Sequence, residues 1–219
     1  MPRTYLIDLY DTLVSSDWER RRAELSSEAG ISVERLDRAF HQTLEARNTG
    51  RYDGVQEGTR AIVLAAGLPD DPEIVRRWVE MTERFMRDDV HLYGDSLPTV
   101  RALRDRGDRA VLVSNCSEDT RTAIDRLGLE EEFDALILSF EIGVRKPDPA
   151  IYRAALSAVA AHPSESLFVD DQIGFCDGAR ALGIDTRLII RPGASPADVA
   201  AASANGHVTI TRLAALLDA

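Results

Sequence analysis

Lysine is nearly missing from this chain of 219 residues. Twenty-five of the 26 basic residues are arginine, and the single lysine is at position 146. Whatever bias replaced lysine by arginine elsewhere did not act at this position. Lys146 is therefore either a leftover surface residue or one whose compact ammonium group a particular site requires.

Cysteine and long apolar runs are also scarce. The two cysteines, Cys116 and Cys176, have neither CxxC spacing nor the density of a disulfide-stapled protein. No apolar run approaches the roughly 18 residues of a membrane span. The first residues, MPRTYLIDLY, lack the shape of a signal peptide. We therefore expect a cytoplasmic protein with reduced thiols and no membrane association.

Positive charge is in short supply. The chain has 37 acidic against 26 basic residues and a formal net charge of −11. This balance argues against electrostatic binding to nucleic acid or to an anionic membrane. Hydrophobic residues make up 44% of the composition, as in globular proteins. The length suits one domain, or one domain that carries a smaller insert.

Short apolar segments alternate with helical patterns along much of the chain. The apolar segments are rich in Val, Leu and Ile, as strands buried on both faces of a parallel sheet are. They span residues 4–11, 109–115, 133–139, 166–171 and 186–192, with a weaker one at 206–210. The helical patterns span residues 96–107, 117–128, 147–160 and 178–183. This alternation predicts a doubly wound, Rossmann-like parallel sheet.

A purely helical region interrupts the alternation. It contains four amphipathic patterns with no strand candidate between them, at 16–30, 32–48, 57–67 and 71–89. We therefore predict an α/β fold in two parts. A Rossmann-like core domain comprises residues 1–15 and 93–219, and an all-helical cap domain comprises residues 16–92. The Pro- and Ala-rich stretch 191–206 is predicted to form a loop and a short helix.

Polar residues gather where the predicted strands end: Asp8, Ser114, Asn115, Asp170 and Asp171. In an open parallel α/β sheet, ligands bind at the carboxyl ends of the strands. Neighbouring carboxylates repel one another, and this repulsion raises their pKa values unless a cation intervenes. Mg²⁺, which binds carboxylates and substrate phosphates, is one such cation. The ammonium group of Lys146, in the loop after the third strand, is another.

Four motifs, in this order, resemble those of the haloacid dehalogenase-like (HAD) hydrolase superfamily. The family's first motif, hhhDxDGT, corresponds to LIDLYDT around Asp8, and its second, a strand ending in Ser or Thr, to LVSN at Ser114. The third is a lysine before PDP and a helix, here RKPDPAIYRAAL. The fourth is a strand with acids before a helix, here LFVDDQIGFCDGARALG. The helical insert matches the family's cap, so the resemblance covers nearly the whole chain.

The resemblance implies a hydrolase that acts on a small molecule through a covalent intermediate. Asp8 would be the nucleophile and would form an aspartyl ester. Lys146 would neutralise charge on Asp8, and Ser114 would hold a phosphoryl oxygen. Asn115 would contact the substrate or orient neighbouring groups. The implied ligands of Mg²⁺ are Asp8, Asp171, Asp170 and the backbone carbonyl of Tyr10.

Two positions depart from the pattern of the family's phosphatases. Tyr10 stands where those enzymes carry a second aspartate, which protonates the leaving alcohol, and Asp11 follows where the family usually has glycine. Phe175 stands where many relatives place Asp or Asn to support the metal, and Asp177 is a candidate substitute. The family's haloacid dehalogenases carry tyrosine at the position of Tyr10, expel halide and need no metal. They have serines, however, at the positions of the fourth-motif acids.

Several polar residues are candidates for substrate contacts. Arg47, Asn48 and Arg51 lie in a polar segment of the cap, from which caps of this family often reach the substrate. Trp18, just after the first motif, either lines the cleft between cap and core or packs within it. Asp11 contacts the substrate if its loop turns toward the site.

Three functions remain in competition. The acids at the strand ends favour a Mg²⁺-dependent phosphatase of a small phosphorylated metabolite. Tyr10 favours a metal-independent 2-haloacid dehalogenase-type hydrolase that forms a carbon ester on Asp8. Tyr10 and Phe175 together favour a catalytically weak member that binds a phosphorylated ligand or a partner protein. The sequence indicates neither the substrate nor the oligomeric state.

Overall fold

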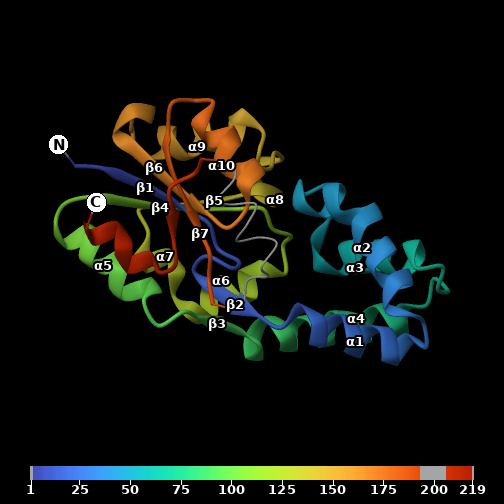
Figure 1. Ribbon diagram of the computed structural model, residues 1–219. Helices are drawn as coiled ribbons and strands as arrows, with labels where there is room; N and C mark the ends of the chain where they lie inside the picture. The colour runs from blue at the N-terminus through green and yellow to red at the C-terminus, as the bar shows by residue number, and fades with distance from the viewer. Residues whose placement is uncertain (1, 193–205, 219) are drawn as a thin grey trace.

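A six-stranded parallel sheet forms the centre of the molecule (Figure 1). The computed structural model describes residues 2–192 and 206–218. The strands lie side by side in the order β5-β4-β1-β6-β7-β8. In chain order they are β1 (Thr4–Ile7), β4 (Arg109–Ser114), β5 (Ala135–Leu138), β6 (Ser166–Asp170), β7 (Asp185–Ile189) and β8 (Thr209–Ile210). Every predicted strand is thus confirmed, and β1 lies between β4 and β6.

Helices cover both faces of this sheet (Figure 1). The helices α9 (Pro149–Ala158) and α10 (Ile173–Arg180) pack on one face, and a 3-10 turn, η1 (Pro163–Glu165), leads into β6. The opposite face carries α5 (Ser96–Asp105), α6 (Thr120–Leu127), the short α7 (Leu129–Glu132) and a C-terminal 3-10 segment, η2 (Leu213–Asp218). Successive residues of β1 point to opposite faces of the sheet: Leu6 packs into the core under α9 and α10, and Ile7 packs into the core on the other face. The fold is therefore the predicted doubly wound α/β fold.

Four helices lie together beside the sheet, as predicted for the insert (Figure 1). They are α1 (Trp18–Ala29), α2 (Val33–Asn48), α3 (Gly54–Ala65) and α4 (Pro72–Asp88), and they share a core of their own around Leu36 and Trp78. A two-stranded antiparallel ribbon, β2 (Val14–Ser16) and β3 (Val90–Leu92), flanks them. The sequence did not indicate this ribbon, because three-residue strands have no readable periodicity. We propose that the cap domain, residues 16–92, joins the core, residues 1–15 and 93–219, through it.

Local signals at the helix ends act as the sequence indicates. The side chain of Asp148 accepts a hydrogen bond from the backbone N–H of Ala150 and caps α9, which begins at Pro149. Gly128 ends α6 in the left-handed conformation, with φ 64°. The predicted loop and short helix at 191–206 fall almost entirely outside the described residues. Within residues 2–192 and 206–218, no helix is both long and apolar enough to cross a membrane.

Candidate active site

Asp8 and Asp170 face one another across a single lysine at the carboxyl end of the sheet. Asp8 follows β1, and its backbone N–H donates to the carbonyl of Val169 at 3.0 Å, which continues the pairing of β1 with β6. Asp170 is the last residue of β6. The Nζ of Lys146 lies 2.5 Å from Oδ1 of Asp8 and 2.7 Å from Oδ2 of Asp170. The position of β1 next to β6 therefore brings residues from opposite ends of the chain into one ion cluster.

Lys146 is held from several sides. Only 1% of its surface is exposed, and its Nζ lies 5.4 Å and 5.1 Å from the ring centres of Phe168 and Phe175. Asn115 fixes its backbone, because Oδ1 of Asn115 accepts from the N–H of Lys146 at 2.7 Å and Nδ2 donates to its carbonyl at 2.9 Å. Asn115 thus orients the lysine segment, one of the two roles considered for it, and Phe175 packs against the ammonium group.

Burial and mutual repulsion raise the pKa values of two of the carboxyl groups. Burial, and then the charge of Asp170, raises the pKa of Asp8 to about 7, although the charge of Lys146 opposes this shift. Burial, followed by the charges of Asp8, Asp170 and Asp11, raises the pKa of Asp171 to about 9. Burial alone lowers the pKa of Lys146, but the two carboxylates together outweigh it, and the net shift is upward. The single ammonium group of Lys146 therefore does not supply enough positive charge for all three carboxyl groups.

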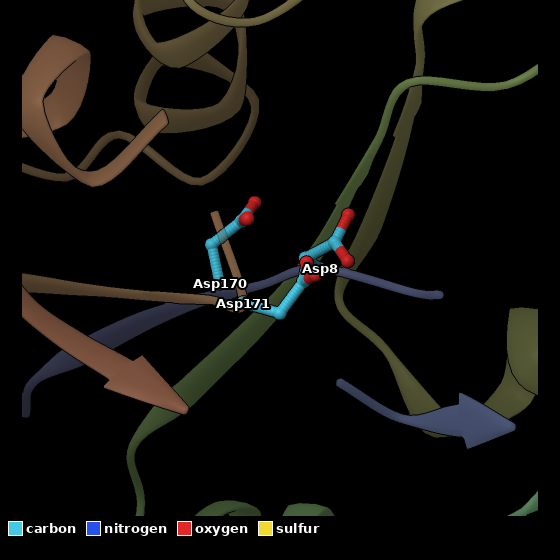
Figure 2. Close-up of side chains that lie close together, drawn as sticks. All are labelled: Asp8, Asp170 and Asp171. Carbon is cyan, nitrogen blue, oxygen red and sulfur yellow. The ribbon is translucent and has the colours of Figure 1, made fainter. Parts of the chain in front are cut away.

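The three carboxyl groups fit a divalent cation. One oxygen from each of Asp8, Asp170 and Asp171 lies within 4.8 Å of the others, and Figure 2 shows the three side chains gathered where β1 and β6 end. Hard carboxylate oxygens suit Mg²⁺, and a bound cation would offset the repulsion that raises the pKa values of Asp8 and Asp171. The backbone carbonyl of Tyr10 stays a predicted further ligand.

Binding of Mg²⁺ is expected to strengthen with pH. Below the raised pKa values of Asp8 (about 7) and Asp171 (about 9), the metal must displace protons. Between about pH 6 and pH 8, the dissociation constant should therefore fall at least roughly tenfold, with release of about one proton or more for each Mg²⁺ bound. Calorimetry in buffers of different ionisation enthalpy measures both quantities. An affinity that stays constant over this range, without proton release, would contradict the assigned ligands.

The same shifts set the pH dependence of stability without metal. The folded-state pKa values of Asp8 and Asp171 lie above the ordinary value of 3.8. The folded state therefore binds more protons than the unfolded state between roughly pH 4 and pH 9. For these two groups, the free energy of unfolding then falls as pH rises through that window.

Ser114 and Tyr10 lie on the side of the sheet that faces α6. Ser114 ends β4 fully buried, and among the described residues its Oγ has no hydrogen-bond partner. A buried hydroxyl without a partner costs free energy, which an incoming acceptor such as a phosphoryl oxygen would offset. The hydroxyl of Tyr10 instead lies 3.0 Å from Oγ1 of Thr120 and 3.6 Å from Sδ of Met86.

The phenol of Tyr10 is poorly placed to act as a base. Burial, and then the nearby Asp119, raise its pKa far above the usual range, so it stays protonated. Its neighbour Asp11 adopts a left-handed backbone with φ 55° and is exposed. Aspartate tolerates this conformation better than most residues, and glycine adopts it freely, which accounts for the family's glycine at this position.

A cleft of about 620 Å³ lies between the cap helices and the core. Its lining includes the predicted substrate-contact residues Asp11, Trp18, Arg47 and Asn48, together with Tyr10 and Asn115. Arg51 is exposed and does not line it. Asp177 does not turn toward the carboxylates, because its Oδ1 lies 3.0 Å from Nε2 of His207.

Sequence reasoning missed one prominent residue of the cleft, Arg21. It lies in the run Glu19–Arg22, which is typical of a solvated helix face, yet its side chain is 8% exposed. The sequence contains no signal that separates Arg21 from Arg20 and Arg22, because only the packing of α1 against α2 and α4 turns it inward.

Comparison with known proteins identifies the family to which the chain is related. The family model of the haloacid dehalogenase-like hydrolases matches residues 2–183. Haloacid dehalogenase-like hydrolase domain-containing protein 3 of Mus musculus is 35% identical over 215 residues, covering 88% of this chain and 83% of the relative. (S)-2-haloacid dehalogenase 1 of a Pseudomonas species is 33% identical, covering 81% of this chain and 71% of the relative. A phosphatase of Mycobacterium tuberculosis is 25% identical, covering 86% of this chain and 87% of the relative.

A solved structure has the same fold. A HAD family enzyme of Bacteroides thetaiotaomicron, in complex with magnesium and inorganic phosphate, superposes with a TM-score of 0.73 at 20% identity, covering 91% of this chain and 99% of the other. The four motifs, the parallel sheet with its helical insert and the family match over residues 2–183 agree with one another. The chain belongs to the haloacid dehalogenase-like hydrolases.

Proposed function

We propose that this hydrolase is a Mg²⁺-dependent phosphatase of a small phosphorylated metabolite, acting through an aspartyl-phosphate on Asp8. The observation that carries the proposal is the cluster of three carboxyl groups around a single buried lysine. One ammonium group cannot neutralise three carboxylates, so the cluster calls for a further cation. The family's metal-independent dehalogenases have serines at the positions of Asp170 and Asp171, so these acids favour the metal-dependent reaction.

The chain's own residues account for most of the reaction. Oδ1 of Asp8 is engaged by Lys146, so Oδ2 is the oxygen that attacks phosphorus, while the bond from phosphorus to the leaving oxygen breaks. Ser114 would donate its unpartnered hydroxyl to a phosphoryl oxygen. Water then attacks the aspartyl-phosphate, which releases phosphate and restores Asp8. Mg²⁺, when held by Asp8, Asp170 and Asp171, supplies positive charge between the carboxylate and the phosphate dianion.

The leaving alcohol needs a proton from a general acid, and Tyr10 stands where the family's phosphatases carry the aspartate that supplies it. Its hydroxyl is engaged with Oγ1 of Thr120. Asp11 is a candidate substitute, because it lines the cleft and its charge contributes to the raised pKa of Asp171. Partial desolvation beside the cleft raises the pKa of Asp11, although the residue as a whole is exposed, and this shift favours a protonated acid. We propose that Asp11 acts as an inefficient general acid toward alkyl phosphates, because its carboxyl group does not stand at the family's usual position.

One observation favours a second function, a 2-haloacid dehalogenase-type reaction. Tyr10 occupies the position at which the family's dehalogenases carry tyrosine, and a (S)-2-haloacid dehalogenase is among the relatives. In that reaction Asp8 would attack carbon and expel halide, and no leaving-group proton is needed. A catalytically weak member that only binds a phosphorylated ligand is the third possibility.

A substrate panel separates these functions. The purified protein is assayed with phosphomonoesters and with 2-haloacids, each in Mg²⁺ and in chelator. The phosphatase proposal predicts phosphate release that chelator abolishes. Halide release that is insensitive to chelator would replace it with the dehalogenase function. Inactivity on both panels, with Mg²⁺ still bound in calorimetry, would favour the binding role.

Replacing Tyr10 by aspartate is expected to raise turnover of alkyl phosphates by about 10²-fold, because a general acid–base group is then present at the family's usual position. Turnover of 4-nitrophenyl phosphate should rise much less, since its leaving group needs no proton. Steady-state kinetics on both substrates measure the difference. Tyr10→Phe, which keeps the ring packed on Trp18, serves as the control and should change neither rate by more than a few fold. Equal gains on both esters, or no gain, would show that a missing acid does not limit the enzyme.

We further propose a cytoplasmic location and a small-molecule partner. The free thiols of Cys116 and Cys176 are buried and fit a reducing compartment. The net charge of −11 disfavours nucleic acid as a partner.

A further inference from the structure

Arg21 is a charged residue enclosed by aromatic rings at the cap side of the cleft. Its guanidinium carbon lies 5.1 Å from the ring centres of Trp18 and Phe85, and 5.7 Å from that of Phe40. These rings come from α1, α4 and α2, so three of the four cap helices meet around it. Aromatic faces attract a cation but do not neutralise its charge.

The hydrogen bonds of Arg21 leave part of the guanidinium unused. Its Nη2 donates to Oγ1 of Thr82 at 3.0 Å and to Oδ2 of Asp119 at 3.3 Å. Its Nε is buried and, within the described part of the chain, has no partner. The carboxylate of Asp119 serves two donors, because its Oδ1 also accepts a hydrogen bond from the hydroxyl of Ser117 at 2.5 Å. A buried N–H donor without an acceptor costs free energy that a ligand oxygen would recover.

A second guanidinium lies beside the first. Arg47 packs 5.2 Å from the ring centre of Phe40, and its hydrogen bonds go to neutral groups, Oγ1 of Thr43 and the carbonyl of Phe40. Burial lowers the pKa of Arg47, Asp119 opposes this shift, and the charge of Arg21 adds to it.

The surroundings of this pair contain little compensating charge. Among the described residues that line the narrow pocket around Arg21 and Arg47, the acids are Asp119 and the exposed Glu118. The buried guanidinium of Arg21 and the half-buried one of Arg47 therefore face one half-buried carboxylate, which leaves a net positive charge on the cap side.

This positive charge adjoins the large cleft, whose lining includes two direct neighbours of the carboxyl cluster. Asn115 is bonded to the backbone of Lys146, and the backbone N–H of Gln172 donates to Oδ1 of Asp170 at 2.8 Å. Arg21, Phe40, Arg47 and Ser117 line both the large cleft and the narrow pocket of about 40 Å³, so the two spaces are contiguous. The narrow pocket has room for a group of a few heavy atoms. A ligand that extends from the carboxyl cluster past Tyr10 would therefore reach a cationic end.

We propose that Arg21, assisted by Arg47, is a specificity-determining subsite for a second anionic group, a carboxylate or phosphate, on the far end of the substrate. The inference rests on the proposed function in one respect: the near end of the same substrate carries the phosphoryl group that faces Asp8. The substrate class is then a phosphorylated acid or a bisphosphate rather than the phosphate ester of a neutral alcohol. The planar guanidinium, with donors in a fixed fork, matches either anion.

Binding of non-hydrolysable phosphonates tests the subsite apart from catalysis. Calorimetry in Mg²⁺ compares alkylphosphonates, ω-carboxyalkylphosphonates and α,ω-bisphosphonates of matched chain lengths. The natural protein should bind at least one of the two series that carry a second anionic group roughly ten- to a hundredfold more tightly than the alkylphosphonates. The favoured series identifies the anion. Arg21→Gln should bring that preference to within about twofold while alkylphosphonate affinity stays unchanged.

Matched variants keep the result interpretable. Arg20→Gln, on the adjacent and exposed residue of α1, should keep the full preference. Arg47→Gln should reduce it in part, and it provides a second reading if Arg21→Gln unfolds at a lower temperature. Equal affinity for all three series in the natural protein, or no binding of any of them, would overturn the subsite, as would an equal loss on every series in Arg21→Gln. Inactivity on phosphate esters with the preference intact would refute the proposed function and leave the subsite standing.

Discussion

Asp8→Asn is expected to abolish turnover, with a fall of about 10⁴-fold or more in kcat, the scale found when a nucleophile is removed. The amide is nearly isosteric with the carboxylate but is a far weaker nucleophile, and it cannot form the aspartyl ester. The substitution also removes one of the two carboxylates that contact Lys146. Phosphate release under saturating substrate measures the loss. KM should change far less than kcat, because the ester still meets Ser114 and the cap.

Two comparisons make this result specific. Asp105→Asn, at the exposed end of α5, should retain the activity of the natural protein. The melting temperature of Asp8→Asn should not fall, since the variant relieves repulsion among the carboxyl groups while Asp170 still pairs with Lys146. Residual activity within about tenfold of the natural protein would mean that another group carries the reaction.

Lys146→Met is expected to produce the largest loss of stability. The ammonium group is 1% exposed and bridges two carboxyl groups that are themselves buried. Removing one partner of a buried ion cluster typically costs about 3–5 kcal/mol, because the charges left behind have no compensation. For a chain of this size the melting temperature should fall by roughly 6–20 °C. The fall should be smaller below about pH 7, where the carboxyl group of Asp8 takes up a proton even with Lys146 present.

A double variant tests whether charge is the cause. Combining Lys146→Met with Asp170→Asn removes one of the stranded carboxylates. The double variant should therefore be more stable than Lys146→Met alone, by about 1 kcal/mol or more, since residues in one ion network are coupled. Additive destabilisation, with the two single losses simply summed, would show that Lys146 acts through packing against Phe168 and Phe175 instead.

The fold and the centre of the site can be predicted from the sequence for a physical reason. Strands buried on both faces are apolar throughout, so residues such as Leu6 and Val111 mark the sheet without alternation. The carboxyl ends of parallel strands share one edge, so the topology alone places Asp8 and Asp170 at the same edge. The lone lysine, conspicuous in the composition, is the ammonium group at that edge.

Other features depend on contacts that no local pattern encodes. The pairing of Asn115 with the backbone of Lys146 joins residues 31 apart in sequence, and nothing near Asn115 indicates it. The inward turn of Arg21 follows from how three cap helices meet, whereas the adjacent Arg20 is exposed. The sequence indicates that Tyr10 matters, but not that its hydroxyl points toward Thr120, because the loop after β1 turns.

The identity of the group bound to Asp8 tests the central claim most directly. The protein is mixed with 4-nitrophenyl phosphate and Mg²⁺, quenched in acid within one turnover, digested and analysed by mass spectrometry. We predict one phosphoryl group on the peptide that contains Asp8, absent in chelator and absent in Asp8→Asn. The account is contradicted if the protein hydrolyses this ester while Asp8 is never phosphorylated. It is also contradicted if a 2-haloacid forms a carbon ester on Asp8 in the presence of chelator.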